Sequence, residues 1–407
     1  MNRRHFFQNA PALAMLAGHA TLESGVAADS SASAPADGGT VGLTTTPPVV
    51  MAPRADGAVV VWAVSRLSRG WVEWETDSGA SGRAETSDDG LFPQADQVMK
   101  VPLRGLEPGT DYRIRTMTEA IDGEPERVES SWKRLRTLDP ASGSTRFVVW
   151  NDTHQHDGTI RQLHQITPKA DFLMWNGDTC NDWKKEELLI PTLLHPGGTD
   201  FSDGRPVLMT MGNHDVRGKY GYRVPGVIAI PGNRPYYAFR SGPVAFVCLH
   251  TGEDKPDDHP SFEGRVSFQP LRERQAEWLA RVVDRPGFRD APYRIVFCHI
   301  PLRLDEEPET LDYANGDYDH YARSSRDLWH ESLVRWKAQV VISGHIHQAA
   351  YLEPTEAFPY AQLIGGGPQP EKARFIEGTA DSGQLTLVTR DLEQQETHRV
   401  SFRPVAS

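Results

Sequence analysis

The sequence has little cysteine and no excess of positive charge. Its 407 residues include three cysteines, and an odd number this small cannot form a disulfide framework. Cys248 and Cys298 lie within apolar runs and are expected to be buried small hydrophobic residues, and Cys180 is expected to be a bystander rather than a metal ligand. The net charge of −12 repels polyanions, which argues against binding to duplex nucleic acid or to an anionic membrane surface.

The N-terminal region lacks an apolar run long enough to cross a membrane. Arg3 and Arg4 precede the short, mildly apolar stretch Ala10–Ala17, and small residues follow. A stretch of this length cannot span a bilayer, but the order of regions is typical of a twin-arginine signal peptide over residues 1–28. The alternative is a disordered tail that happens to contain two arginines. We therefore expect a periplasmic or secreted protein whose mature chain has no transmembrane segment.

The length of the chain predicts two domains, because 407 residues exceed the size of one ordinary hydrophobic core. Residues 29–43 are rich in Ser, Ala, Asp and Gly and are expected to form a disordered linker. Over 44–138, short runs with a period of two residues are separated by turn sequences, which predicts an all-β antiparallel sandwich. From 145 to 407, apolar strands alternate with helix-like segments, which predicts an α/β domain.

The α/β region contains two clear helical patterns and two late strand-like runs. Apolar side chains recur at helical spacing over Gln269–Val283 and Ala322–Ala338, which predicts a helix in each segment. Ala361–Ile364 and Gln384–Val388 have strand-like sequences, and we expect both to complete a second sheet.

The turn before a late strand of the sandwich resembles the turn found at that place in fibronectin type III domains. It runs from Leu106 to Tyr112, and in that family the tyrosine packs into a corner of the sandwich. Trp62 occupies the position of the family's buried tryptophan on an early strand. The resemblance implies a fibronectin III-like fold over 44–138. It says little about function, because such domains serve as spacers and as binding modules.

Five apolar runs in the second region each lead directly to side chains with oxygen or nitrogen lone pairs. The groups are Asp152-Thr153-His154, Gly177-Asp178, Gly212-Asn213-His214-Asp215, His299 and Gly344-His345-Ile346-His347. Each group alone has an ordinary explanation, such as a surface hydrogen bond or a turn. Five in succession, each after a probable strand, predict side chains that converge at the carboxyl ends of the strands. Oxygen and imidazole ligands suit Fe, Mn or Zn.

These motifs, in this order and spacing, resemble those of the calcineurin-like metallophosphoesterases over about 145–350. The resemblance implies a four-layer αββα sandwich with a binuclear metal centre at its strand ends. It implies that one ion is bound by Asp152, His154, Asp178 and His347. It implies that the other ion is bound by Asp178, Asn213, His299 and His345, with the Asp178 carboxylate bridging the two ions.

The expected chemistry is hydrolysis of a phosphate ester. Two cations that share a carboxylate lower the pKa of a bridging water, and the resulting hydroxide can attack phosphorus in line. His214 is the expected proton donor to the departing oxygen, and Asp215 is expected to orient its ring. The alternative for His214 is a hydrogen bond that only stabilises the loop.

Candidate substrate-binding residues follow the third motif. Arg217, Lys219, Tyr220 and Arg223 interleave cations with aromatic rings and could bind a phosphate and an adjoining ring. His156, just after the first motif, could border the same site. The alternative is a solvated loop without a ligand.

The expected substrate is a small-molecule phosphate ester, and three functions compete. The first is an exported phosphomonoesterase. The second is a phosphodiesterase acting on cyclic nucleotides or glycerophosphodiesters, and the third is a non-catalytic surface-binding protein with structural metals. The domain order resembles that of the purple acid phosphatases, but those enzymes carry a tyrosine ligand to ferric iron where this chain has Asn181. The colour of an iron phenolate is therefore not expected.

Overall fold

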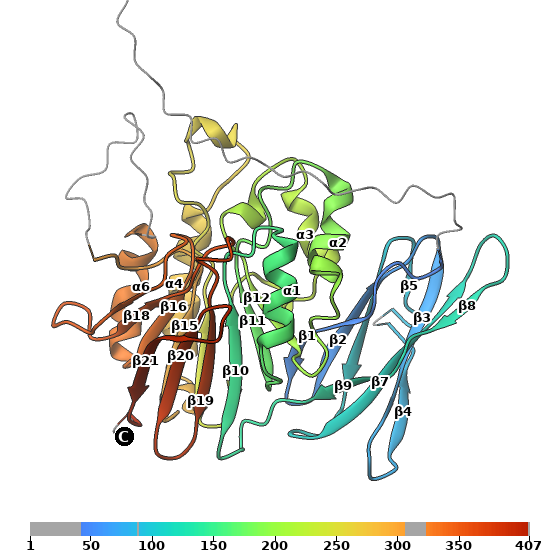
Figure 1. Cartoon of the computed structure of the whole chain (residues 1–407), viewed down its shortest axis with the longest axis horizontal. Coiled ribbons are helices and arrows are strands. Elements are labelled where there is room, and N and C mark those ends of the chain that lie inside the picture. Colours follow the sequence, from blue (N-terminus) through green and yellow to red (C-terminus); the bar gives the residue numbers. More distant parts are fainter. Residues whose placement is uncertain (1–41, 88, 306–322, 406–407) are drawn as a thin grey trace, which may run out of the picture. The chain divides into compact units, whose positions relative to one another are not determined.

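The computed structural model describes residues 42–87, 89–305 and 323–405 (Figure 1). The expected signal peptide lies outside the described residues, as does the expected linker 29–43 except for its last two positions. Residues Val41–Ser407 form one compact unit. Cys180, Cys248 and Cys298 are all buried free thiols, as the apolar surroundings of the last two predicted.

The first sheet has nine strands in the order β21-β20-β19-β10-β11-β12-β1-β2-β6. Its centre is four neighbouring parallel strands, β10, β11, β12 and β1, with antiparallel strands added at both sides. The strands are β1 (Val49–Arg54), β2 (Gly57–Ala63), β6 (Val98–Arg104), β10 (Thr145–Trp150), β11 (Phe172–Asn176), β12 (Val207–Thr210), β19 (Phe375–Ala380), β20 (Leu385–Arg390) and β21 (Glu396–Phe402).

The second sheet has six strands in the order β13-β14-β15-β16-β18-β17 and packs face to face on the first. These strands are β13 (Tyr237–Ser241), β14 (Val244–Cys248), β15 (Tyr293–Phe297), β16 (Val340–Ser343), β17 (Ala350–Leu352) and β18 (Ala361–Ile364). Phe147 and Phe172 of the first sheet lie edge-on against Phe246 of the second, with ring centroids 5.2 Å apart in both pairs. Aromatic rings therefore fill the layer between the sheets.

Helices cover the outer face of each sheet, which completes four αββα layers (Figure 1). The first sheet is covered by α1 (Asp157–Ile166), α2 (Leu189–Leu194) and α3 (Val224–Val227), and the second by α4 (Gln269–Val282), α5 (Pro286–Arg289) and α6 (Arg323–Arg335). Short 3-10 helices are η1 (Glu186–Leu188), η2 (Pro196–Gly198), η3 (His214–Val216), η4 (Gly221–Arg223), η5 (Pro231–Asn233) and η6 (Pro260–Phe262). The predicted helices over 269–283 and 322–338 are confirmed as α4 and α6, with α6 ending earlier than expected.

The N-terminal region is an antiparallel sandwich, as predicted. Its outer sheet contains β3 (Ser68–Glu75), β4 (Ser81–Ala84), β5 (Gln94–Ala95), β7 (Asp111–Ala120), β8 (Arg127–Glu129) and β9 (Lys133–Arg136). Trp62 is fully buried between the layers and donates from Nε1 to Thr118 Oγ1 at 2.9 Å. The hydroxyl of Tyr112 accepts a hydrogen bond from the backbone N–H of Glu107 at 2.8 Å. The tyrosine of the predicted turn therefore does hold the corner.

The sandwich and the α/β region share one continuous sheet. β1 pairs in parallel with β12, with Met51 opposite Val207. Side chains alternate along β1, so Val50 faces the core of the sandwich whereas Met51 faces the helices over the first sheet. The inner sheet of the sandwich is thus an extension of the sheet that positions the site described below.

One prediction for the C-terminal strands is wrong. Ala361–Ile364 forms β18 of the second sheet as expected, but residues 385–390 form β20 of the first sheet. The reason is that β19 pairs antiparallel with β10, and β20 follows β19 through a tight hairpin. Strands joined by a hairpin are neighbours, so β20 must lie in the same sheet as β19.

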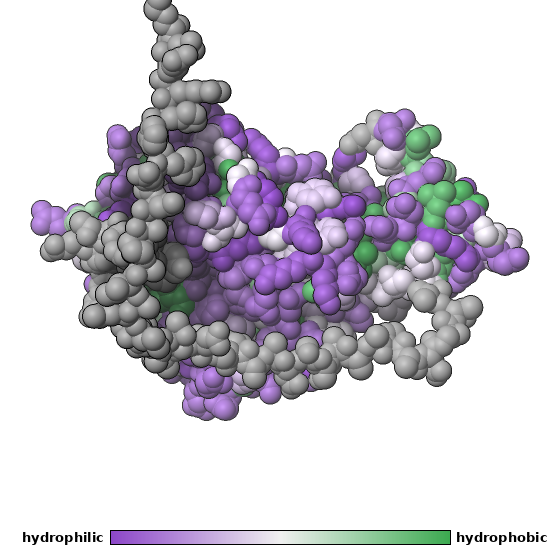
Figure 2. Space-filling model, turned by 90° about the horizontal axis from the view of Figure 1, so that it is seen from above, coloured by the Kyte–Doolittle hydropathy of each residue, from purple (hydrophilic) through white to green (hydrophobic). Residues whose placement is uncertain are grey.

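The surface is mostly hydrophilic in the view from above, with hydrophobic residues gathered toward the N-terminal sandwich (Figure 2). Leu67, Leu91, Ile121 and Trp132 of that region are large apolar side chains that are each at least 37% exposed. Among the residues that the structure describes, no helix has the length and apolar character that a membrane crossing requires.

Candidate metal centre

The predicted ligand groups meet because their strands end at the same edge. β10, β11 and β12 are parallel neighbours, with Trp150 opposite Trp175 and Asn176 opposite Thr210. The residues that follow these strands therefore emerge side by side. β15 and β16 of the facing sheet are also parallel neighbours and bring their own following residues, including His299 and His345, to the same edge.

One group of side chains contains Asp152, His154, Asp178 and His347, with one donor atom from each lying within 4.8 Å of the others. His154 Nε2 lies 3.4 Å from Asp178 Oδ2, and His347 Nε2 lies 3.6 Å from Asp152 Oδ1. The two histidine Nε2 atoms are 2.9 Å apart. This set is the one expected for the first ion.

A second group contains Asp178, His299 and His345 within the same 4.8 Å limit. His299 Nε2 lies 3.1 Å from Asp178 Oδ2. Asn213 Oδ1 is 3.0 Å from Nδ1 of His345, which places the amide beside this group. Asp178 belongs to both groups, so the structure brings together all the predicted ligands with this carboxylate between the two sets.

The backbone at these positions is unusual. Asp152, His154, Asp178, His345 and His347 all have positive φ angles, from 43° to 75°. Non-glycine residues adopt this left-handed region at a cost, and such residues tend to cluster at functional sites. The strained loops turn each side chain inward over the strand ends.

Two glycines of the motifs are required by crowding. A Cβ atom on Gly212 would collide with the Asp178 carboxylate, and one on Gly344 would collide with the Asp152 carboxylate. Glycine at these positions therefore lets the loops approach the two carboxylates closely.

The electrostatics of the two groups fit a cation. Burial raises the pKa of Asp152 to about 7, whereas His299 and His154 overcome the burial of Asp178 and hold its pKa well below the usual value. Burial opposes a charge on His299 too, but Asp178 and Asp152 raise its pKa to about 10. Two buried carboxylates thus need positive charge close by, which a metal ion would supply.

The imidazole nitrogen atoms give a second test of whether the site fits a metal ion. Nε2 of His299 is buried and forms no hydrogen bond with a described residue, although Asp178 is near. Burial and the neighbouring His154 lower the pKa of His347 to about 4, which leaves His347 neutral. The close Nε2 atoms of His154 and His347 can share at most one proton, but both lone pairs can point at one cation. The residues present therefore fit divalent metal ions.

Side chains behind the ligands fix their rings. His299 Nδ1 is 2.9 Å from the backbone oxygen of Asn176. His154 Nδ1 is 3.1 Å from Asn181 Oδ1, and Asn181 Nδ2 donates to the His154 oxygen. Such contacts select the ring nitrogen that faces the ion. This role of Asn181 was not predicted from the sequence, although its position soon after Asp178 could have suggested a contact with the metal ligands.

The expected contact between Asp215 and His214 is absent, which corrects the prediction. Asp182 Oδ1 lies 2.7 Å from His214 Nδ1 instead. Asp215 is buried and accepts from Thr179 and Gly212, with its Oδ2 2.8 Å from the Gly212 N–H. The physical reason is the 3-10 turn η3, in which neighbouring side chains diverge and Asp215 turns inward. Asp215 therefore stabilises the motif loop, and Asp182 is the carboxylate that orients His214.

Two of the candidate substrate residues line one pocket. Arg217 and Lys219 border a pocket of about 620 Å³ that also contacts Asp182. Arg217 is committed to other partners, since it donates to both oxygens of Glu253 and to Asp254 at 2.6 to 2.9 Å. Its guanidinium is therefore held in the pocket wall by these carboxylates, whereas the Lys219 side chain is exposed.

The other three candidates lie elsewhere. Tyr220 packs on the apolar cluster beneath α2 and α3. Arg223 pairs with Glu186 at 3.2 Å. His156 is exposed and its Nδ1 lies 2.9 Å from the hydroxyl of Thr159 in the first turn of α1. These contacts hold the three side chains locally, and none of the three lines the pocket that Arg217 and Lys219 border.

Comparison with known proteins adds relatives by sequence. Residues 145–349 match the calcineurin-like phosphoesterase family. Serine/threonine-protein phosphatase CPPED1 of Pongo abelii is 23% identical over 266 residues, which are 60% of this chain and 78% of that protein. The protein of the same name from Homo sapiens is 24% identical with the same coverage.

Two solved structures share the fold. Purple acid phosphatase PPD1 from yellow lupin (Lupinus luteus) seeds has a TM-score of 0.65 at 15% identity, covering 88% of this chain and 74% of that one. PhoD has a TM-score of 0.59 at 13% identity, covering 89% and 92%. Residues 145–407 make up about two thirds of this chain (263 of 407), so the likeness extends into the N-terminal sandwich.

Proposed function

This chain belongs to the calcineurin-like phosphoesterase family of metal-dependent phosphoric ester hydrolases, and on that premise we propose that it is a binuclear-metal phosphomonoesterase. The observation that carries the proposal is the position of Asp178 between two sets of ligand atoms. One carboxylate shared in this way would serve as a ligand in both sets when metal is bound. The ligand types favour Fe, Mn or Zn.

When bound, the ions supply Lewis acidity, which acidifies a water molecule and offsets the charge of the phosphate oxygens. The chain holds the ligands in place. Backbone N–H groups donate to both central carboxylates: that of His345 to Asp152 Oδ1 at 2.8 Å and that of His214 to Asp178 Oδ1 at 2.9 Å. These bonds fix the carboxylates, so little reorganisation accompanies the reaction.

His214 is the proposed proton donor to the departing alcohol. Its ring is 28% exposed, lies 5.0 Å from the ring of His154 and is oriented by Asp182 at Nδ1. Nε2 is then the atom that can deliver a proton. In a His214→Asn variant we expect metal content to be kept and kcat on an alkyl phosphate, a poor leaving group, to fall about 10²-fold. A variant with the wild-type rate on that ester would refute the assignment.

A monoester is the favoured substrate over a diester. CPPED1 and the lupin protein PPD1 are both named as phosphatases, and Lys219 offers an exposed cation in the pocket beside Asp182. A monoester carries more negative charge than a diester and benefits more from such a cation. Comparing kcat/KM on nitrophenyl phosphate and bis-nitrophenyl phosphate decides between them, because a higher value on the second compound would establish the phosphodiesterase alternative.

A surface-binding protein with structural metals is the distant alternative. A structural site has no need of a partly exposed histidine with an orienting carboxylate beside it, and this is the arrangement of His214 and Asp182. Absence of turnover on every phosphate ester tested, with Fe, Mn or Zn supplied, would favour this alternative.

Export through a twin-arginine signal is part of the proposal and rests on the sequence around Arg3 and Arg4. Replacing both by lysine should keep the full-length chain in the cytoplasm of the producing bacterium. Cell fractionation tests this, and unchanged export of the double variant would contradict it.

A further inference from the structure

An apolar pocket of about 440 Å³ lies near the candidate metal centre. Its walls include Met211, Ile228, Ile230, Phe268 and Leu271. Met211 directly precedes the motif that holds Asn213 and His214, and Leu271 stands on the first turn of α4. The pocket therefore joins a ligand-bearing loop to a helix of the opposite layer.

The apolar pocket adjoins the charged pocket that Asp182 helps to line. Both pockets are lined by Val216, Tyr222, Arg265 and Val266. Val216 is two residues from His214, whose ring Asp182 orients. Val216 and Val266 are thus apolar side chains shared by the pocket beside the proposed proton donor and the apolar pocket.

Met211 and Ile228 belong to the hydrophobic core, but other parts of the pocket wall are less buried. Leu271 and Ile230 are only partly buried at the edges of core clusters, and Val266 belongs to no core cluster among the described residues. Tyr222 is 73% exposed at the point where the two pockets meet. Exposed apolar surface beside a polar reaction centre is what a substrate with an apolar portion would cover.

We propose that this pocket binds the apolar part of the alcohol that the enzyme releases, so that the substrate is the phosphate monoester of an apolar alcohol with an alkyl chain or ring. The inference rests on the proposed function, because His214 defines the side of the centre on which the leaving group lies. The phosphate occupies the metal centre, and the alcohol extends past His214 along Val216 and Val266.

The test is calorimetric binding of methyl-, propyl- and hexylphosphonate to the metal-containing protein as purified. Each buried methylene should tighten binding about fourfold, so hexylphosphonate should bind far more tightly than methylphosphonate. Val266→Ser and Leu271→Asn should reduce this chain-length effect and leave methylphosphonate binding unchanged. Val334→Ser is the matched control, because Val334 is a 36% exposed valine on α6 that does not line the pocket.

The outcomes separate this inference from the proposed function. Equal affinity for the three phosphonates, or a chain-length effect that neither pocket variant changes, would overturn the inference. If the enzyme hydrolyses glycerol phosphate and shows no chain-length effect, the inference alone fails. If hexylphosphonate binds in the pocket but no phosphate ester is hydrolysed, the proposed function fails and the apolar site stands.

Discussion

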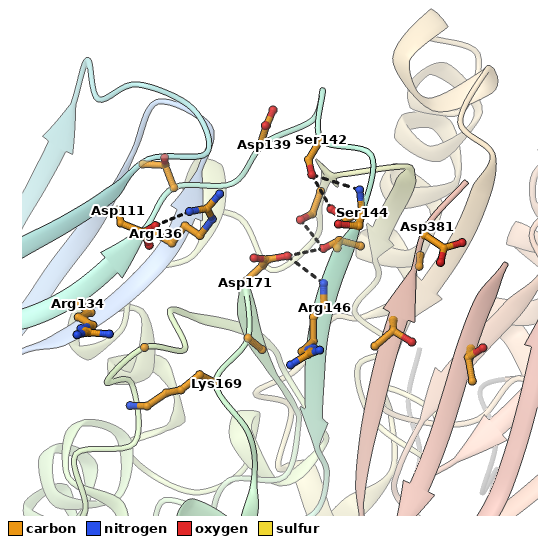
Figure 3. A pocket seen from close by; sticks show the side chains of 18 of the residues that line it. Asp111, Arg134, Arg136, Asp139, Ser142, Ser144, Arg146, Lys169, Asp171 and Asp381 are labelled. Carbon is orange, nitrogen blue, oxygen red and sulfur yellow. Dashed lines mark hydrogen bonds and ion pairs between the residues drawn. The ribbon is translucent and has the colours of Figure 1, made fainter. Parts of the chain in front are cut away.

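The carboxylates at the two ends of the central strands have different kinds of partner. At the amino ends of β10 and β11, a pocket of about 590 Å³ is lined by Asp139, Asp171 and Asp381 among other polar residues (Figure 3). Asp171 accepts from the Thr145 hydroxyl and the Arg146 N–H, both at 2.9 Å. Each of the other two accepts backbone N–H groups in its own turn. The fold itself satisfies these carboxylates.

At the carboxyl ends, each of the two central carboxylates accepts a backbone N–H and otherwise faces imidazole rings. Asp152 and Asp178 are completely or almost completely buried, and they face the rings of His154, His299 and His347. No Lys or Arg of the described residues forms an ion pair with either carboxylate. The difference teaches that the amino end is a structural polar surface, whereas the carboxyl end is incomplete without a cation.

The largest expected effect comes from removing the shared carboxylate. We expect Asp178→Asn to lower kcat/KM on nitrophenyl phosphate by about 10³-fold or more, since both of the proposed ions would depend on this oxygen pair. The wild-type protein should gain thermal stability when metal is added, and the variant should lose that gain. Activity assays and thermal unfolding with and without metal measure both effects. A variant that is still stabilised by metal and still active would place the ions elsewhere.

The next effect distinguishes the role of Asp182 from that of Asp215. Asp182→Asn should lower kcat on an alkyl phosphate about 10²-fold and have a much smaller effect on nitrophenyl phosphate, whose leaving group needs little protonation. Asp215→Asn should instead affect both substrates equally, because Asp215 holds the loop through Thr179 and Gly212. Steady-state kinetics on the two esters gives the ratio. An unchanged ratio in Asp182→Asn would remove Asp182 from the role of orienting the proton donor.

A substitution at the amino ends of β10 and β11 should lower stability and leave activity unchanged. Asp171→Ala removes the acceptor of the Thr145 hydroxyl and the Arg146 N–H, so the free energy of unfolding should fall by about 1 to 2 kcal/mol. Activity and stabilisation by metal should not change. Chemical denaturation and kinetics on the same preparation provide the check, and a large loss of activity at constant stability would abolish the contrast between the two ends.

The last effect concerns only the pH dependence of stability, and it involves a cation that lies at neither end. Lys100 of β6 donates to the carbonyl oxygens of Pro225 and Ile228, and burial lowers the pKa of its amine to about 8, from 10.5. The unfolded chain therefore binds this proton more tightly than the folded chain, so stability should rise as pH increases from about 8 to 10.5. Lys100→Met should flatten that rise. Parallel pH profiles of unfolding by urea would show this, and identical slopes would contradict the assignment.

The sequence predicted the alternation of strands and helices and the polar groups at the strand ends because both depend on local patterns, whereas the four layers were implied by the family resemblance. Apolar runs at strand spacing, followed by Asp178 or His299, identify parallel strand ends without any knowledge of packing. The family resemblance then assigned the ligands, and the structure places their donor atoms together. Likewise, the turn ending at Tyr112 identified the sandwich, and its hydroxyl contact is present.

The errors concern features that depend on three-dimensional context. Asp182 could not be distinguished from Asp215 by spacing, because the turn at His214 decides which carboxylate meets the ring. The place of β20 depends on the pairing of β19 with β10, which joins segments more than two hundred residues apart. Arg217 looked available for phosphate, but Glu253 and Asp254, distant in sequence, bind it.

The most direct test of the central claim is elemental analysis of the wild-type and Asp178→Asn proteins purified without added metal. If Asp178 bridges two ions, the wild type should contain close to two equivalents of Fe, Mn or Zn per chain, and the variant should lose both. A fully active wild type with one equivalent or less, or a variant that keeps two, would contradict the account.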